Sequence, residues 1–215
     1  MKKTIILLIL FTACSPLWAQ VTIDRIQGNV EIQLPGESSW QKAEQGAVLP
    51  DSARISTGFN STARLLVNGE TTVSLKALSR LTVEEATRQN NGSQNTKLFL
   101  GSGRIRADVR RTDGSIHDFK VGTPVATAAV RGTSFDMGSG TLRVSEGTVT
   151  YTVGSYSFSV QRGQSANIRL INGRPGLIPT AEDLLSERQV SINTGGSTAD
   201  SGSAGKTGYA VIELR

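Results

Sequence analysis

The sequence predicts an all-β protein, either a β-sandwich or an irregular β-solenoid-like stack with hairpin connections, and one short helix near the C-terminus. Two observations support this prediction. Apolar and polar residues alternate with a period of two between residues 21 and 171, as they do in strands with one buried face. Glycine-containing turn motifs interrupt the alternation at short intervals, and such motifs favour the tight turns between neighbouring strands.

The alternation is clearest in residues 104–110, where three apolar residues face away from four charged ones. The apolar set is Ile105, Ala107 and Val109, and the charged set is Arg104, Arg106, Asp108 and Arg110. Turn motifs follow or separate such segments at Asn68-Gly69, Asp113-Gly114, Gly138-Ser139-Gly140 and Gly154-Ser155. We therefore expect hairpins at these positions.

A short pattern of glycine, polar residue and β-branched residue opens three of the expected strands. It occurs as Gly28-Asn29-Val30, Gly103-Arg104-Ile105 and Gly147-Thr148-Val149. The spacings between the three copies are unequal, so a solenoid of regular repeats is not supported.

The ends of the chain differ in composition from its middle. Residues 1–19 combine the cationic start Met1-Lys2-Lys3 with a short apolar run, as in a secretory signal peptide. Residues 20–171 form the expected all-β domain. Residues 172–193 contain the expected helix, beginning near Pro179 with Thr180 as its cap. Residues 194–207 resemble a flexible Gly/Ser linker, and residues 208–215 a strand-like tail.

Two processing sites compete in the leader. Cleavage after Ala19 follows a small residue and is the favoured interpretation, whereas lipidation of Cys14 in a loose lipobox would give a membrane-anchored lipoprotein. Either route places the protein outside the cytoplasm, in the periplasm or beyond. Cleavage after Ala19 removes two lysines and lowers the formal net charge from +5 to +3. This mild excess does not favour nucleic acid as a partner.

The composition disfavours an enzyme and predicts no cofactor or metal. One cysteine and one histidine among 215 residues exclude a disulfide framework and histidine-rich metal sites. His117 and Asp118 are adjacent, and neighbouring residues of a strand point to opposite faces, so we do not expect them to form a catalytic pair. The carboxylates Glu84 and Glu85 have no histidine or acidic cluster beside them.

Four segments of the sequence resemble elements of the FecR domain family, and they follow one another along the chain in the family's order. Gly122–Asp136 contains the Thr-Pro and Val-Arg-Gly-Thr-x-Phe elements of the family motif, and Thr141–Val149 resembles its following strand and turn. Ser56–Leu81 and Leu100–Ile105 resemble its earlier elements. The resemblance covers about residues 46–162, roughly half of the chain.

The resemblance implies an extracytoplasmic all-β domain. In the best-known family members, this domain lies on the periplasmic side of an anti-sigma regulator in the inner membrane, which relays iron–siderophore status from an outer-membrane transporter. This sequence shows neither the cytoplasmic sigma-binding segment nor a membrane-spanning helix after it. We therefore expect a standalone module, to which the transcriptional half of that mechanism does not carry over.

Five arginines are the candidate partner-binding residues: Arg104, Arg106, Arg110, Arg111 and Arg131. Their guanidinium groups suit carboxylates, acidic partner edges and anionic polymers. We therefore predict a non-enzymatic FecR-domain protein that acts in the cell envelope by protein–protein contact, in signal sensing or assembly. The alternative is an envelope carbohydrate- or peptidoglycan-binding module. The identity of the protein partner and any link to iron stay open.

Overall fold

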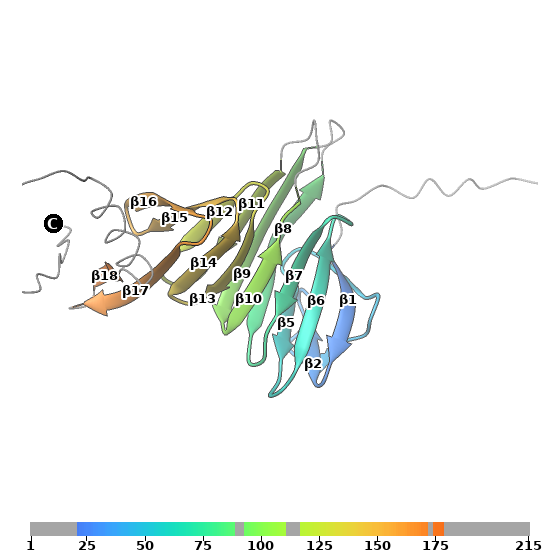
Figure 1. Ribbon diagram of the computed structural model, residues 1–215. Helices are drawn as coiled ribbons and strands as arrows, with labels where there is room; N and C mark the ends of the chain where they lie inside the picture. Colours follow the sequence, from blue (N-terminus) through green and yellow to red (C-terminus); the bar gives the residue numbers. More distant parts are fainter. Residues whose placement is uncertain (1–20, 89–92, 111–116, 172–173, 179–215) are drawn as a thin grey trace, which may run out of the picture.

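The computed structural model describes residues 21–88, 93–110, 117–171 and 174–178, and these residues form two β-sheets (Figure 1). Sheet 1 contains, in spatial order, β18 (Arg174–Ile178), β17 (Ser165–Ile171), β14 (Thr141–Glu146), β13 (Ser134–Gly138), β10 (Arg104–Asp108), β7 (Thr71–Leu75), β6 (Thr62–Val67), β1 (Val21–Gln27) and β4 (Val48–Leu49). Sheet 2 contains β16 (Tyr156–Gln161), β15 (Thr148–Val153), β12 (Thr127–Val130), β11 (His117–Gly122), β9 (Gln94–Ser102), β8 (Arg80–Arg88), β5 (Arg54–Thr57), β2 (Val30–Gln33) and β3 (Gln41–Lys42).

The chain advances along the sandwich while it alternates between the two sheets. Figure 1 shows this as a colour gradient, from the blue strands at one end to the orange strands at the other. The hairpin β6–β7 lies in sheet 1, β8–β9 in sheet 2, and β10 returns to sheet 1. Between β9 and β11 the chain runs back through sheet 1 as β10, so β9 and β11 run parallel in sheet 2. The predicted all-β architecture is confirmed. The two sheets form a sandwich, and the strands follow one another along it as in a solenoid.

Three of the four predicted hairpins are present. Asn68-Gly69 joins β6 to β7, Gly138-Ser139-Gly140 joins β13 to β14, and Gly154-Ser155 joins β15 to β16. The fourth prediction is wrong, because the strands before and after Asp113-Gly114, β10 and β11, belong to different sheets. The predicted signal peptide, the helix near Pro179, the Gly/Ser linker and the tail lie outside the described residues.

The core lies between the sheets and consists of the inward-facing residues of the alternating pattern. Ile105 and Phe135 are fully buried, and Val109 and Val130 are 5% exposed. Tyr151, also fully buried, packs edge-on against Phe158 with 5.7 Å between ring centroids. The burial of these residues removes apolar surface from water, which is the main favourable term in folding.

Serine hydroxyls join pairs of crossings between the sheets at the lower end of the sandwich in Figure 1. The N–H of Asn29 donates to Oγ of Ser61 at 2.8 Å, and the N–H of Arg104 donates to Oγ of Ser79 at 3.0 Å. The glycine before each donor has a positive φ, and a Cβ on it would overlap the serine. This close approach explains why the same glycine-containing pattern recurs in the sequence.

The hydroxyl of Tyr151 generates a prediction about alkaline pH. It is buried with no hydrogen-bond partner among the described residues, and burial raises its pKa to about 12. Unfolding restores the ordinary pKa near 10, so the unfolded chain loses this proton first as the pH rises. We expect the free energy of unfolding to fall by up to about 2 kcal/mol between pH 10 and pH 12. Urea titrations across that range measure it.

The variant Tyr151→Phe tests the origin of this fall. It lacks the titrating group and should lose less stability at high pH, and at pH 7 it should be as stable as the native chain or more so, by up to about 1 kcal/mol. Tyr156→Phe, at an exposed tyrosine, is the matched control. A loss of more than about 1 kcal/mol in Tyr151→Phe at pH 7 would show that the hydroxyl is hydrogen-bonded.

Candidate functional site

The outer face of sheet 1 carries two of the five predicted arginines. Arg104 and Arg106 project from β10 to solvent together with Asp108, while Ile105 and Ala107 between them are buried. Arg110 is exposed and follows the end of this strand. The predicted alternation of β10 is therefore confirmed.

The other two predicted arginines, Arg111 and Arg131, lie outside β10. Arg111 lies outside the described residues. Arg131 is exposed in the connection that leads from β12 of sheet 2 to β13 of sheet 1. Arg131 therefore does not lie on the strand that carries Arg104 and Arg106.

Two carboxylates partly neutralise Arg106. Its Nη1 lies 3.5 Å from Oδ2 of Asp136, and its Nε lies 3.6 Å from Oδ2 of Asp108. No such contact joins the guanidinium of Arg104 to another described residue. Exposed ion pairs contribute little to stability, so this part of the face is available for recognition.

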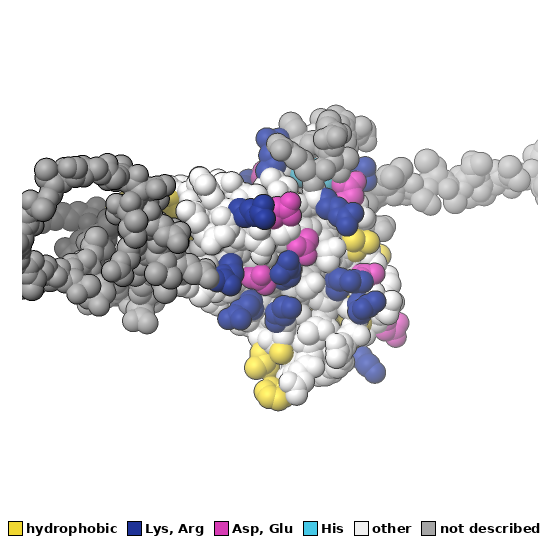
Figure 2. Space-filling view, in the orientation of Figure 1, with side chains coloured by type: hydrophobic (Ala, Val, Ile, Leu, Met, Phe, Trp, Pro, Cys, Tyr) yellow, Lys and Arg dark blue, Asp and Glu magenta, His cyan; other side chains and the backbone are white. Residues whose placement is uncertain are grey.

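Strand register extends the charged row across the sheet. In order, the residues at one level are Ser165, Arg143, Asp136, Arg106, Ser74 and Arg64. Arg64 also pairs with Asp24 of β1. Figure 2 shows the result as dark blue and magenta side chains interspersed on one face. The face therefore combines both signs of charge in a fixed order.

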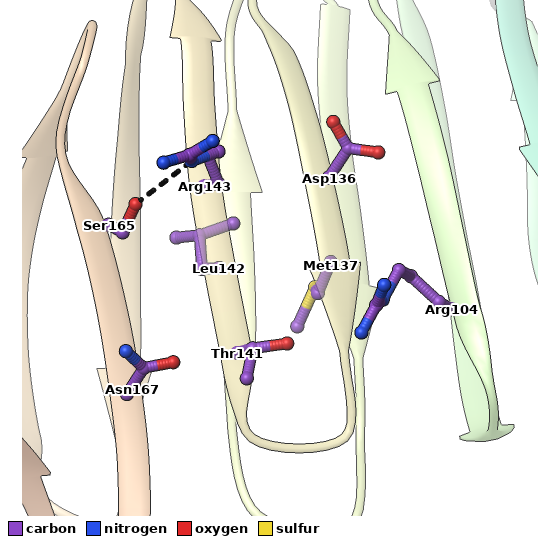
Figure 3. A pocket seen from close by; sticks show the side chains of 8 residues that line it. All are labelled: Arg104, Asp136, Met137, Thr141, Leu142, Arg143, Ser165 and Asn167. Atoms are coloured by element: carbon purple, nitrogen blue, oxygen red, sulfur yellow. Dashed lines mark hydrogen bonds between the residues drawn. The ribbon is translucent and has the colours of Figure 1, made fainter. Parts of the chain in front are cut away.

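A shallow depression of about 430 Å³ lies on this face between β10, β13, β14 and β17 (Figure 3). Its polar lining residues are Arg104, Asp136, Thr141, Arg143, Ser165 and Asn167. Nε of Arg143 donates to Oγ of Ser165 at 3.3 Å, which holds that guanidinium at one side. Arg104 approaches from the opposite side, beyond Met137, as Figure 3 shows. Two guanidinium groups thus flank a space lined with hydroxyl and amide groups.

Gly138 lies between Arg104 and Thr141, two residues that line the depression. It alternates with the inward-facing Phe135 and Met137, and it pairs directly with Arg104 across the β10–β13 ladder. A Cβ at this position would lie 2.9 Å from Oγ1 of Thr141. The missing side chain therefore leaves the space that Arg104 and Thr141 border.

Sequence analysis missed most of this depression. Arg143, Ser165 and Asn167 come from strands far from β10 in the sequence, and β17 lies beside β14 only because of the strand order. The available signal was the alternation of residues 141–146, which places Arg143 on the face away from Leu142 and Val144. The neighbouring strands could not be identified from that signal.

Arg131 adjoins a second shallow concavity, of about 600 Å³, on sheet 2. The chain crosses between the sheets here through Gly132 and returns through Gly147. Both glycines have positive φ, and Oγ1 of the buried Thr133 donates to the carbonyl of Thr148 at 3.1 Å. A Cβ on Gly147 would lie 2.8 Å from the carbonyl oxygen of Gly132. The two glycines therefore let the outgoing and returning crossings pack closely against each other.

The side chains that could support catalysis do not converge on one site in the described part of the chain. His117 is buried and Asp118 is exposed, so they face opposite sides of β11, and the nearest carboxylate oxygen to His117, from Glu70, is 3.6 Å away. Glu85 binds Lys97 at 2.8 Å, and this hydrogen bond lowers the pKa of Glu85. A lowered pKa is the opposite of what a general acid requires.

The described residues contain no group of three or more His, Cys, Asp or Glu side chains placed to hold a metal ion. None of them forms a helix long and apolar enough to cross a membrane.

The two sheets, the tight crossings and the Val-Arg-Gly-Thr motif define an all-β module of a known kind. Residues 53–155 match the model of the FecR protein family. The match confirms the resemblance to this family that the sequence predicted. The match lies inside the segment of residues 46–162 in which the resemblance was found.

Two solved structures are similar in fold, both of a provisionally assigned anti-sigma factor from Parabacteroides distasonis ATCC 8503. For the crystal structure at 1.65 Å resolution, the identity is 17%, the TM-score is 0.48, and the alignment covers 63% of this chain and 64% of that one. For the structure at 2.50 Å, the identity and TM-score are the same, and 62% of each chain is covered. The alignment thus spans less than two thirds of those proteins. No curated protein matches the sequence.

The crossing at Gly147 generates a stability prediction. Gly147→Ala should lower the free energy of unfolding by about 3 kcal/mol, because the new Cβ adds an overlap with the carbonyl of Gly132 to the cost of a positive φ. Gly154→Ala is the matched control, since Gly154 also has a positive φ but open space around it. It should cost only about 1 kcal/mol. Equal losses in the two variants, measured by urea unfolding, would contradict the close packing of this crossing.

Proposed function

We propose that this chain is an exported FecR-domain protein that acts in the cell envelope by contact with another protein, in signal sensing or assembly. The family match supports the signalling context, and the similar solved structures are of a protein provisionally assigned as an anti-sigma factor. The contact surface in this proposal is the outer face of sheet 1, with the depression between Arg104 and Arg143 at its centre.

The single observation that carries the proposal is the pair of guanidinium groups beside the depression. Arg104 has no ion pair among the described residues, and Asp136, the acidic group of the lining, is engaged by Arg106. Arginine binds carboxylates through two parallel hydrogen bonds, which give both energy and orientation. The partner therefore presents a carboxylate, either an acidic side chain or a chain terminus, to this depression.

The lining also favours one second candidate, an envelope carbohydrate or peptidoglycan. Thr141, Ser165 and Asn167 are donors and acceptors that can bind sugar hydroxyls. Sedimentation with purified cell wall separates the two candidates. A module that acts by protein contact stays in the supernatant, whereas a wall-binding module enters the pellet.

Site-specific crosslinking in living cells tests the protein contact. A photoreactive amino acid in place of Asn167 should crosslink to one envelope protein, while the same group in place of Thr150, exposed on sheet 2, should not. Charge reversal by Arg104→Glu with Arg143→Glu should reduce the crosslinked product about tenfold or more, because each lost charge-assisted contact contributes about 1.5–3 kcal/mol. Arg54→Glu, on sheet 2, is the matched control.

The two controls show whether the crosslinked product reports a contact at this face. A product that survives the double reversal, or that forms equally from the Thr150 position, would overturn the assignment of this face. Loss of the product in the Arg54→Glu variant as well would show a general effect of net charge instead of a local contact.

Export also remains a proposal, and it rests on the cationic and apolar leader. Mass spectrometry of the protein recovered from the cell envelope should find Gln20 at the N-terminus, as expected after cleavage behind Ala19. A diacylated Cys14 at the N-terminus would support the lipoprotein alternative. A chain that retains Met1 in the cytoplasm would contradict export by either route.

A further inference from the structure

Two adjacent turns at the lower end of the sandwich expose large apolar side chains. Phe59, in the turn between β5 and β6, is 77% exposed, and Leu78, between β7 and β8, is 60% exposed. The N–H of Leu78 donates to the carbonyl of Gly58 at 3.2 Å, so the two turns are in direct contact. Figure 2 shows the yellow tip that results at the bottom of the molecule. We call Phe59 and Leu78 the apolar tip.

Buried hydrogen bonds hold the backbone of the apolar tip. Oγ1 of Thr57 donates to the carbonyl of Lys76 at 2.6 Å and accepts from the N–H of Ser79 at 2.9 Å. Between these contacts, Leu78 has a φ of 57°, in the left-handed region that large side chains rarely adopt. The residue thus combines a strained backbone with an apolar side chain in water. Such outliers persist where the surrounding structure fixes them, often at sites with a function.

The turns between the two sheets at this end carry cations but no carboxylates among the described residues. Lys76 and Arg104 are exposed beside the apolar tip, and Figure 2 shows dark blue side chains as the charged groups nearest to the yellow tip. The described turns at this end, at residues 27–29, 58–61, 76–79, 101–104, 122–126, 138–141 and 154–155, contain no aspartate or glutamate. By contrast, turns and strand ends at the opposite end carry Asp51, Glu70 and Glu146.

We propose that the apolar tip inserts into the headgroup region of an anionic phospholipid bilayer, with Lys76 on the lipid phosphates. This contact lies beyond the protein contact proposed above. Apolar side chains and flanking cations together are the two signals that bind a protein to an anionic membrane surface. Two side chains on a protruding pair of turns offer far less than the roughly 800 Å² per partner of a typical protein interface.

A fluorescent probe at the tip tests the insertion in the full chain. Bimane is attached at Ala77→Cys, which leaves Phe59 and Leu78 intact, in a chain with Cys14→Ser to prevent lipidation. The control probe is at Ser145→Cys, exposed at the opposite end. We expect a blue shift of the emission at position 77 with vesicles of phosphatidylcholine and phosphatidylglycerol. We expect none with phosphatidylcholine alone, and none at position 145, even if the leader itself binds the vesicles.

Substitutions then separate binding from folding. Leu78→Asn should lower the vesicle affinity reported by this probe about tenfold, the factor expected for withdrawing much of a leucine side chain from an apolar environment. The same variant should unfold at the same urea concentration or a higher one, because asparagine tolerates a positive φ. Lys76→Gln should lower the affinity about fivefold at low salt, and the difference should vanish at high salt.

Val48→Thr is the matched control, because Val48 is 47% exposed on the edge strand β4, away from the tip. The vesicle affinity of the Val48→Thr variant should equal that of the native chain. An unshifted emission at position 77 on anionic vesicles would overturn the proposal and leave the tip to a protein partner. An equal shift at both probe positions, or full affinity in Leu78→Asn, would overturn it too. None of these variants alters the depression between Arg104 and Arg143, so the outcomes are distinguishable from those of the crosslinking experiment.

Discussion

The close packing of backbone crossings between the two sheets is the constraint on which the rest of the structure depends. A chain that alternates between sheets must pass over the edge of the core repeatedly, and each passage leaves backbone N–H and carbonyl groups to be satisfied. At the lower end, Ser61 and Ser79 accept hydrogen bonds from the crossing beside them. At the upper end, Thr133 donates to the returning crossing after Gly147. Short hydroxyl side chains therefore fix the spacing of the two sheets.

These fixed crossings determine what the outer faces can present. With the spacing of the sheets fixed, most inward positions are apolar, and outward positions are free to vary. On sheet 1 the outward positions form a row in which Asp136 lies between Arg143 and Arg106, so neighbouring charges have opposite signs across each ladder. Cross-strand pairs of opposite charge favour the register instead of opposing it. The charged face is thus compatible with the fold, and at Gly138 a side chain would crowd Thr141 of the depression.

The sequence was informative wherever a feature depends on neighbours along the chain. The alternation in residues 104–110 predicted which residues of β10 are buried, and the turn at Asn68-Gly69 was found from two residues. Features that depend on strand order were not accessible. Arg104 and Asn167 meet at one depression because β13 and β14 lie between their strands, and no local pattern encodes this. The exposure of Leu78 was hidden for a related reason, since an apolar residue in a strand-rich segment is ordinarily assigned to the core.

Leu78 also shows how the crossings relate to function. A turn without constraints would relax a leucine out of the left-handed region, because the alternative conformations are more favourable for a large side chain. Here Thr57 and Ser79 bind the backbone on either side of the turn, and Ser79 is the same residue that accepts from Arg104. One hydrogen-bond cluster therefore fixes a strained apolar residue at the tip and the first arginine of the charged face. The two candidate surfaces are held in register by the same few buried hydroxyl groups, and a change at Ser79 would displace both.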